Sequence, residues 1–530
     1  MPGSGSLRCV VRRWGVLAFA FAFGVSMPGA SRGENFRTAI RNGNEDHEPA
    51  RRNFVFFLAD DLGWTDVGCF GSSFYETPNI DRLAARGMRF TRAYAACPVC
   101  SPTRASLLTG KYPARVGVTD YISPDGGNQP ERWGRGTPLL PSAYRDRLAL
   151  EETTLAEALR AAGYATFFAG KWHIGPAGFY PEDQGFEHNQ GGIERGGPYG
   201  GKQYFSPYGN PRLEDGPPGE HLPDRLATET VRFIETETAK QRPFLAYLSF
   251  YSVHTPLIGR PDLVEKYEKK RAAREHDGPR WRPEGARHDR QVQDHPVYAA
   301  MVEAMDLAVG KVLAALDRLE IADETVVVFF SDNGGLSTSE GHPTSNLPLR
   351  AGKGWLYDGG VRAPCVVRAP GLTRAASVSD VSIVSVDFFP TFVELAGLPR
   401  AEPAGDGVSI VPLLRDPAAQ LAPRQIFWHY PHYGNQGGAP GGAVLDGDWK
   451  LVEWYEDGRR ELYDLAHDVG ERDDRAAAEP ERVAALAKRL DAWRREVGAV
   501  MPAKNSKPSP ERVAESHRRA DAASQTGRWR

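Results

Sequence analysis

The chain has 530 residues, of which 41% are hydrophobic and 25% charged, and its formal net charge is −3. This length can bury the core of one large α/β domain and of a smaller second one. Because the chain has no overall excess of positive charge, its composition argues against a nucleic-acid partner.

Residues 1–33 have the pattern of a signal peptide. Arg8 and Arg12 precede an apolar run from Val16 to Val25, and small residues follow this run. The run is too short to span a bilayer comfortably. We therefore predict an exported protein that is periplasmic, secreted or otherwise extracytoplasmic and has no stable insertion in a membrane.

Four apolar segments have the pattern of strands that are buried on both faces. They span residues 53–59, 165–169, 244–250 and 325–330. Helical patterns lie between them, at 78–86, 155–162, 224–236 and 297–319. This alternation predicts an α/β fold with a large, mostly parallel central sheet and helices on both faces.

After residue 424 the pattern changes to short strands that are separated by Gly and Asp turns. These strands are expected at 425–429, 449–453 and 461–464, and a helix is expected near 480–497. The pattern predicts a smaller C-terminal antiparallel subdomain with a packed helix. We divide the chain into the α/β domain (50–415), this subdomain (424–500) and a polar, disordered tail (501–530).

Each of the four apolar strands leads into polar side chains. In chain order these are Asp60 and Asp61, Lys171 and His173, His254, and Asp332 and Asn333. Ligands of parallel α/β sheets bind beyond the carboxyl ends of the strands, so we expect these side chains to lie close together. For each aspartate alone, a turn or a helix cap is the simpler interpretation.

The carboxylates among these residues point to a metal site. Asp60, Asp61 and Asp332 cannot lie together in their ionised form without a cation, and Asn333 adds a neutral oxygen. Oxygen ligands select a hard ion, calcium or magnesium, over zinc or copper.

The segment from Cys97 to Arg104, Cys-Pro-Val-Cys-Ser-Pro-Thr-Arg, precedes a helical pattern. Cys100 is therefore expected at a helix N-terminus, where free N–H groups and the helix dipole favour an anion. Arg104 would lie one turn further along the same helix face. Cys97 and Cys100 also form a C-x-x-C pair, which is compatible with a redox pair or with half of a zinc site.

Lys353 and His254 each allow two interpretations. Glycines on both sides of Lys353 would let the backbone approach an anion closely, but a lone lysine is usually a solvated charge. His254 is compatible with a hydrogen-bonded, buried histidine or with a general acid near neutral pH.

The cassette Cys100-Ser-Pro-Thr-Arg104 resembles the signature of the type I sulfatases, which belong to the alkaline phosphatase superfamily. Further segments are similar to sulfatase segments and occur in the same order. They are Asp60-Asp61-Leu-Gly-Trp, Thr77-Pro-Asn-Ile-Asp81, Gly170-Lys171-Trp-His173, His254-Thr-Pro256, Ser331-Asp332-Asn333-Gly334 and Gly352-Lys353.

The resemblance implies an alkaline phosphatase-like fold and hydrolysis of a sulfate ester, of the arylsulfatase type, on an aryl sulfate or a sulfated carbohydrate. The nucleophile would be a formylglycine hydrate, made from Cys100 by a formylglycine-generating enzyme. The implied ligands of Ca²⁺, or less favourably Mg²⁺, are Asp60, Asp61, Asp332, Asn333 and the modified Cys100.

The resemblance also implies a role for each remaining residue. Arg104 and Lys171 would hold the hydrate and its charge, and His173 would bind the hydrate and help to take its proton. Lys353 would bind the sulfate oxygens together with Lys171 and His254. His254 would in addition protonate the leaving oxygen.

Two other functions fit the same residues. One is a phosphodiester or phosphonate hydrolase of the same superfamily, and the other is a glycan-binding protein in which Cys100 is not matured. Substrate choice is expected to lie in the loops at 121–150, 185–223 and 259–296. Their arginines, such as Arg132, Arg135 and Arg195, would contact a sulfated polysaccharide or be plain surface charges.

Overall fold

The structure is a computed structural model that describes residues 52–399 and 405–526. The predicted signal peptide lies outside these residues. Among the described residues, every helix is too short or too polar to cross a membrane.

The large sheet has eight strands in the order β12-β2-β11-β10-β1-β7-β5-β6. Their bounds are β1 (Asn53–Ala59), β2 (Met88–Phe90), β5 (Ala165–Gly170), β6 (His188–Gln190), β7 (Phe244–Ser249), β10 (Thr325–Ser331), β11 (Cys365–Arg368) and β12 (Ser377–Ser379). The four predicted strands are the adjacent parallel strands β10, β1, β7 and β5. Only β11 runs antiparallel to its neighbours, β10 and β2, so the prediction of a mostly parallel sheet is confirmed.

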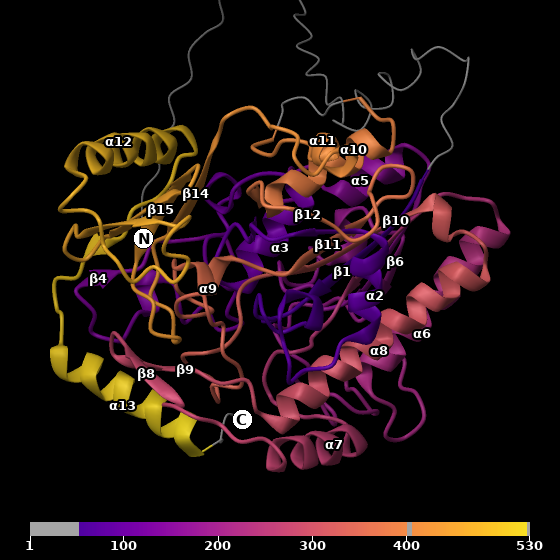
Figure 1. Cartoon of the computed structure of the whole chain (residues 1–530), viewed down its shortest axis with the longest axis horizontal. Coiled ribbons are helices and arrows are strands. Elements are labelled where there is room, and N and C mark those ends of the chain that lie inside the picture. Colours follow the sequence, from indigo (N-terminus) through magenta and orange to yellow (C-terminus); the bar gives the residue numbers. More distant parts are fainter. Residues whose placement is uncertain (1–51, 400–404, 527–530) are drawn as a thin grey trace, which may run out of the picture.

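Side chains of β1 alternate between two hydrophobic clusters, one on each face of the sheet. Val55 and Phe57 pack on one face, and Phe54 and Phe56 pack on the other. The first face is covered by α2 (Pro78–Arg86), α6 (Leu222–Ala239), α7 (Pro261–Ala272) and α8 (Pro296–Arg318). The second is covered by α3 (Cys100–Thr109), α5 (Leu155–Ala161), α10 (Phe388–Leu395) and α11 (Val411–Arg415) (Figure 1).

The helices begin and end where local chemistry predicts. Proline occupies the first turn of α2, where a missing N–H costs nothing, and Gly87 ends this helix. Thr154 forms a capping box with Glu157 at the start of α5.

The segment 259–296 contains α7 and a hairpin of β8 (Trp281–Glu284) and β9 (Arg287–Arg290).

The second sheet has four antiparallel strands: β14 (Gln425–Tyr430), β15 (Gly441–Asp446), β16 (Trp449–Trp454) and β17 (Arg460–Asp464). Helix α12 (Pro480–Glu496) packs on it, as Figure 1 shows. A shared hydrophobic cluster, which includes Tyr94, Tyr357 and Trp428, joins this sheet to the α/β part. The predicted fold class is therefore confirmed in both parts, while the domain boundaries stay a prediction.

The C-terminal tail differs from the predicted disorder. Strand β18 (Ala503–Lys504) pairs with β4 (Leu139–Leu140), and α13 (Pro510–Thr526) follows. The backbone N–H of Asn505 donates to Pro138, and that of Ser509 donates to Gly136. This polar segment is thus ordered by backbone pairing with a loop, which its composition does not reveal.

The shorter elements connect these layers. They are β3 (Ala93–Tyr94), β13 (Ile383–Val384), α4 (Pro113–Val116) and α9 (Asp358–Val361), with 3-10 turns at Gly68–Phe70, Pro130–Arg132, Pro181–Gln184, Ala322–Glu324 and Ser385–Asp387.

Candidate active site

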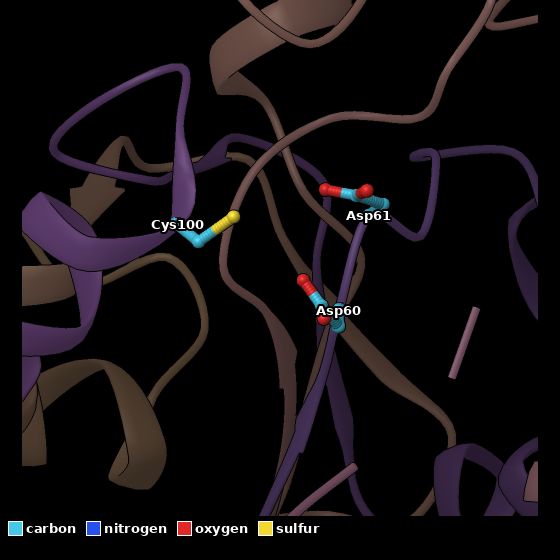
Figure 2. Close-up of side chains that lie close together, drawn as sticks. All are labelled: Asp60, Asp61 and Cys100. Atoms are coloured by element: carbon cyan, nitrogen blue, oxygen red, sulfur yellow. The ribbon is translucent and has the colours of Figure 1, made fainter. Parts of the chain in front are cut away.

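Cys100 is the first residue of α3, as the sequence predicts. The preceding Val99 is extended, and the helix ends at Gly110, which has a φ of 66°. The Cys100 side chain is buried and points from the start of α3 toward the end of β1 (Figure 2). Its sulfur and carboxylate oxygens of Asp60 and Asp61 all lie within 4.8 Å of one another.

The parallel pairing of β1 and β10 brings the acidic residues together. Ala59 lies beside Ser331, so the residues that follow both strands emerge at the same edge. The backbone N–H of Asp61 donates to Asp332 Oδ1 at 3.2 Å, and Asn333 Nδ2 donates to Asp61 Oδ1 at 2.9 Å. These contacts join residues that are far apart in the sequence. We call Asp60, Asp61, Asp332 and Asn333, together with the buried cations that pair with them, the floor of the site.

Each carboxylate of this floor is bonded to a buried cation. Arg104 donates to Asp332 Oδ2 from Nε at 2.9 Å and from Nη2 at 2.7 Å. Lys171 Nζ lies 2.7 Å from Asp60 Oδ2, and Lys353 Nζ lies 2.7 Å from Asp61 Oδ2. All six side chains are at most 4% exposed. The three ion pairs compensate the cost of burying these charges, and their formal charges sum to zero.

A glycine makes the position of Lys171 possible. Gly170 ends β5 with a φ of 99°, and a Cβ atom there would lie 1.9 Å from the carbonyl oxygen of Ser249. The close approach to β7 lets the N–H of Lys171 donate to Ser249 at 2.8 Å. Arg104 Nη1 in turn donates to the Lys171 carbonyl at 2.8 Å, which ties α3 to the end of β5.

Burial and neighbouring charges set the protonation of these groups. Burial raises the pKa of Asp60 well above its ordinary value. Burial also opposes ionisation of Asp61, but Lys353 and then His254 outweigh it and lower the pKa of Asp61. Burial raises the pKa of the Cys100 thiol to about 12, so the unmodified thiol is a poor nucleophile at neutral pH.

The redox and zinc interpretations of the C-x-x-C pair gain nothing from the structure. Cys97 and Cys100 are both free thiols, and burial raises the pKa of both. The groups of potential metal ligands among the described residues contain a single cysteine or none.

Both histidines are held by backbone carbonyls, which fixes the role of each ring nitrogen. His173 Nε2 lies 2.9 Å from the Ile122 oxygen and therefore donates, whereas its buried Nδ1 has no partner among the described residues. His254 Nδ1 donates to the Thr255 oxygen at 2.7 Å, and its Nε2 lies 3.7 Å from Asp61 Oδ2.

Both imidazoles are neutral at pH 7 in this arrangement. Burial, followed by the charge of Lys171, lowers the pKa of His173 well below its ordinary value. Burial, followed by the charge of Lys353, lowers the pKa of His254 to about 4. A neutral His173 that donates from Nε2 presents a lone pair at Nδ1, so this atom can accept a proton.

A cavity of about 300 Å³ opens above Cys100. His173, His254 and Lys353 line it, and so do side chains that sequence reasoning did not identify: Tyr121, Tyr199, Glu340, Asn435 and Gln436. Tyr121 and Tyr199 lie in loops that are expected to govern substrate choice, whereas no motif in the sequence marks Glu340, Asn435 and Gln436.

The three loop arginines differ in their contacts and in their position relative to the cavity. Arg195 lines the cavity, and its Nη1 donates to the carbonyls of Tyr199 and Gly209. Arg135 stacks on Trp133 and donates to the Tyr433 carbonyl, and Arg132 donates to the Asp125 carbonyl. Of the three, only Arg195 lies at the cavity.

The donor set of the floor fits a hard divalent cation. Asp60 Oδ1 and Asn333 Oδ1 are buried and have no hydrogen-bond partner among the described residues. Carboxylate and amide oxygens are the ligands that calcium and magnesium prefer. The structure thus brings together all ten residues that the sequence proposed for the site, although their chemical roles stay predictions.

The comparisons with known proteins all match sulfatases. The model of the Sulfatase family matches residues 52–398, and that of the N-sulphoglucosamine sulphohydrolase C-terminal region matches residues 351–496. The chain is 32% identical to a sulfatase of Formosa agariphila, over 81% of this chain and 85% of that protein. It is also 32% identical to human arylsulfatase A, over 72% of this chain and 71% of that protein.

The fold is similar to that of a solved structure, Ps i-CgsB in complex with k-i-k-neocarrahexaose. The TM-score is 0.68 at 26% sequence identity, and the match covers 90% of this chain and 100% of that one.

Proposed function

Because the chain belongs to the sulfatase family, whose members are sulfuric ester hydrolases, we propose that it hydrolyses a sulfated carbohydrate or an aryl sulfate through a formylglycine made from Cys100. The observation that carries this proposal is the position of Cys100. This residue begins helix α3, and its side chain faces a buried floor of three carboxylates and three cations. A formylglycine-generating enzyme would be the maturation partner.

Asp60, Asp61, Asp332 and Asn333, with the modified residue 100, would hold a Ca²⁺ ion, or less favourably Mg²⁺. When bound, the ion supplies positive charge that stabilises the sulfuryl oxygens. The three carboxylates and three cations of the floor balance. A divalent cation would therefore leave the site with a net positive charge, which suits the anionic sulfate ester.

The formylglycine supplies, as a geminal diol, the hydroxyl group that attacks sulfur. His173 would accept the proton of this hydroxyl at Nδ1, because Nε2 already donates to the Ile122 carbonyl. Arg104 and Lys171 would stabilise the charge on the hydrate. Both are held in place before the reaction begins, so they need no costly reorganisation.

His254 and Lys353 would act on the ester itself. Lys353 Nζ would bind the sulfate oxygens, together with Lys171. His254 donates from Nδ1 to a backbone carbonyl, so only Nε2 is available to protonate the leaving oxygen. The negative charge of a bound sulfate ester would oppose the effect of Lys353 and raise the pKa of His254, so substrate binding would favour the acid form.

Export of the protein is part of the proposal. The predicted signal peptide supports a periplasmic, secreted or otherwise extracytoplasmic location.

The test combines peptide mass spectrometry with kinetics. Protein that is produced with a formylglycine-generating enzyme is digested, and the peptide that contains residues 97–104 is analysed. We expect an aldehyde in place of the Cys100 thiol, and turnover of 4-nitrophenyl sulfate in proportion to the converted fraction. Active protein with only free thiol at Cys100 would reject the proposed nucleophile.

The same preparation separates the alternatives. Aryl phosphodiester and aryl phosphonate are assayed beside the aryl sulfate, with Cys100→Ala as the matched control. Faster turnover of the phosphorus esters would favour the phosphodiesterase or phosphonate hydrolase. Retention of sulfated glycans without sulfate release, despite verified formylglycine, would favour the binding protein.

A further inference from the structure

Three acceptor groups that have no role in the proposed reaction line the same cavity as Cys100. They are the carboxylate of Glu340 and the side-chain amides of Asn435 and Gln436. Glu340 lies in the loop that follows β10, whereas the two amides lie in the loop between β14 and β15. The second sheet therefore contributes directly to the cavity.

The two amides fix the carboxylate and are themselves fixed by it. Gln436 Nε2 donates to Glu340 Oε1 at 2.6 Å, and Asn435 Nδ2 donates to the same oxygen at 3.1 Å. The backbone carbonyl of Gln436 accepts hydrogen bonds from Thr338 Oγ1 and Trp355 Nε1. Because the nitrogen of each amide donates to Glu340, the orientation of the amide is set and its oxygen remains as an acceptor.

These amide oxygens lack protein partners. Asn435 Oδ1 and Gln436 Oε1 are buried and make no hydrogen bond with the described residues. A buried acceptor without a partner costs free energy, and most such atoms in proteins are paired. Because both residues line the cavity, a ligand with hydroxyl or amine donors that enters it would supply these partners.

The remaining oxygen of Glu340 faces the reacting region. Oε2 accepts one long hydrogen bond, from Thr255 Oγ1 at 3.4 Å. A carboxylate oxygen of Glu340 lies within 4.8 Å of Asp61 and His254 atoms. Glu340 is 6% exposed and adopts a φ of 55°, which is rare for a residue other than glycine and is typical of functional sites.

We propose that Glu340, Asn435 and Gln436 form an acceptor subsite that selects a carbohydrate leaving group with a free hydroxyl beside the sulfated position and disfavours a second sulfate or a carboxylate there. This inference rests on the proposed sulfatase function. A hydroxyl donates to the acceptors, whereas a second anion meets the carboxylate of Glu340 and leaves the acceptors unpaired. Tyr199, which is 44% exposed, offers an aromatic surface for the sugar ring at the same cavity.

Glu340→Gln tests the subsite with little change of shape. Its amide oxygen can still accept from Asn435 and Gln436, while its nitrogen replaces the acceptor Oε2. Three substrates are compared: a methyl glycoside monosulfate with a free neighbouring hydroxyl, the corresponding vicinal disulfate, and 4-nitrophenyl sulfate. We expect the wild-type preference in kcat/KM for the monosulfate over the disulfate to fall by about tenfold in the variant.

The aryl sulfate provides the internal control, because it has no hydroxyl for the subsite. Its kcat/KM should change by less than about twofold in Glu340→Gln. An equal loss on all three substrates would overturn the inference, since Glu340 would then act only by positioning His254. Glu235→Gln, on the exposed side of α6 with Arg318 as partner, is the matched surface control and should leave every ratio unchanged.

A binding measurement separates this inference from the proposed function. Cys100→Ala and Cys100→Ala/Glu340→Gln are titrated with the monosulfate and the disulfate by calorimetry, with no turnover required. The first variant should bind the monosulfate at least about tenfold more tightly than the disulfate, and the second should lose this difference. Equal affinities in the first variant would overturn the subsite, whereas a matured enzyme without sulfatase activity would overturn only the proposed function.

Discussion

Two of the buried clusters of charged residues in the described part of the chain are built differently. The site cluster consists of Asp60, Asp61, Asp332, Arg104, Lys171 and Lys353. The interface cluster lies between the two sheets, where Lys450 Nζ is 2.7 Å from Asp358 Oδ1 and 2.9 Å from Glu471 Oε1. Both clusters are buried and pair opposite charges.

The two clusters differ in how closely their carboxylate oxygens are paired and in whether a cavity lies beside them. In the interface cluster, Tyr94 and Arg362 also contact Asp358, and the Asp358 N–H donates to Glu471 at 2.6 Å. Glu471 Oε1 makes no hydrogen bond with the described residues, but it pairs closely with Lys450 Nζ at 2.9 Å. The site cluster adjoins a cavity, and its unbonded oxygen, Asp60 Oδ1, has a longer ion pair, with Arg104 Nη2 at 3.6 Å. Buried charge alone therefore does not mark a functional site. Free ligand atoms beside a cavity are the better sign.

The largest expected effect follows from removing the nucleophile of the site cluster. Cys100→Ala should lower kcat for aryl sulfate by about 10⁴-fold or more, because the covalent route is lost. Its melting temperature should stay close to that of the wild type, because the ion pairs of the floor remain. The measurements are steady-state kinetics and thermal unfolding. Residual activity near the wild-type level would contradict the role of Cys100.

The interface cluster should respond in the opposite way. Lys450→Met leaves two carboxylates buried without their shared cation, so we expect a loss of about 3–5 kcal/mol in the free energy of unfolding. Urea unfolding measures this change, and Lys311→Met, on the exposed side of α8, is the control. A loss below about 1 kcal/mol would show that the cluster is not the structural element described here.

Metal binding at the site cluster should raise the free energy of unfolding, and the interface cluster should not contribute to this response. An ion at 100 times its dissociation constant stabilises the folded state by about 2.7 kcal/mol. We therefore expect Ca²⁺ to raise the melting temperature of chelator-treated protein, and Asn333→Ala to weaken this response. Lys450→Met should retain the response at its own lower melting temperature. If Asn333→Ala responds to Ca²⁺ as fully as the wild type, the proposed ligand set is wrong.

The smallest effect concerns pH and the interface cluster. Burial, partly offset by Lys450, raises the pKa of Glu471 to about 7. A raised pKa in the folded state means that protonation favours folding, so this stability is present at low pH and is lost as the pH rises toward 7. Relative to Glu471→Gln, the wild type should lose about 2 kcal/mol between pH 5 and pH 8. Parallel stability curves for both proteins would contradict this assignment.

Sequence reasoning reached the floor of the site because strand ends are visible in the sequence. Asp60 directly follows a continuous apolar run, and Asp332 follows another with Ser331 between them. Parallel strands place such residues at one edge. Helix α3 is also predictable from the sequence, since Cys100 opens a helical pattern that Gly110 ends. The family resemblance then supplied roles for these residues that spacing alone does not contain.

Other parts depended on contacts that the sequence does not encode locally. Strand β2 has only three residues, and β15 begins with Gly441-Gly442, which reads as a turn. Glu340 and Gln436 meet only because the second sheet packs against the first. The tail pairs with the loop at 136–140 through backbone atoms, which carry no sequence signal.

We propose that the site cluster is a cation site beside residue 100. The most direct test is a crystal structure of the matured protein with Ca²⁺, using anomalous scattering to locate the ion. We predict one ion in contact with Asp60, Asp61, Asp332 and Asn333 and adjacent to a formylglycine at position 100. An ion located elsewhere, with these four side chains unchanged and free of metal, would contradict the account.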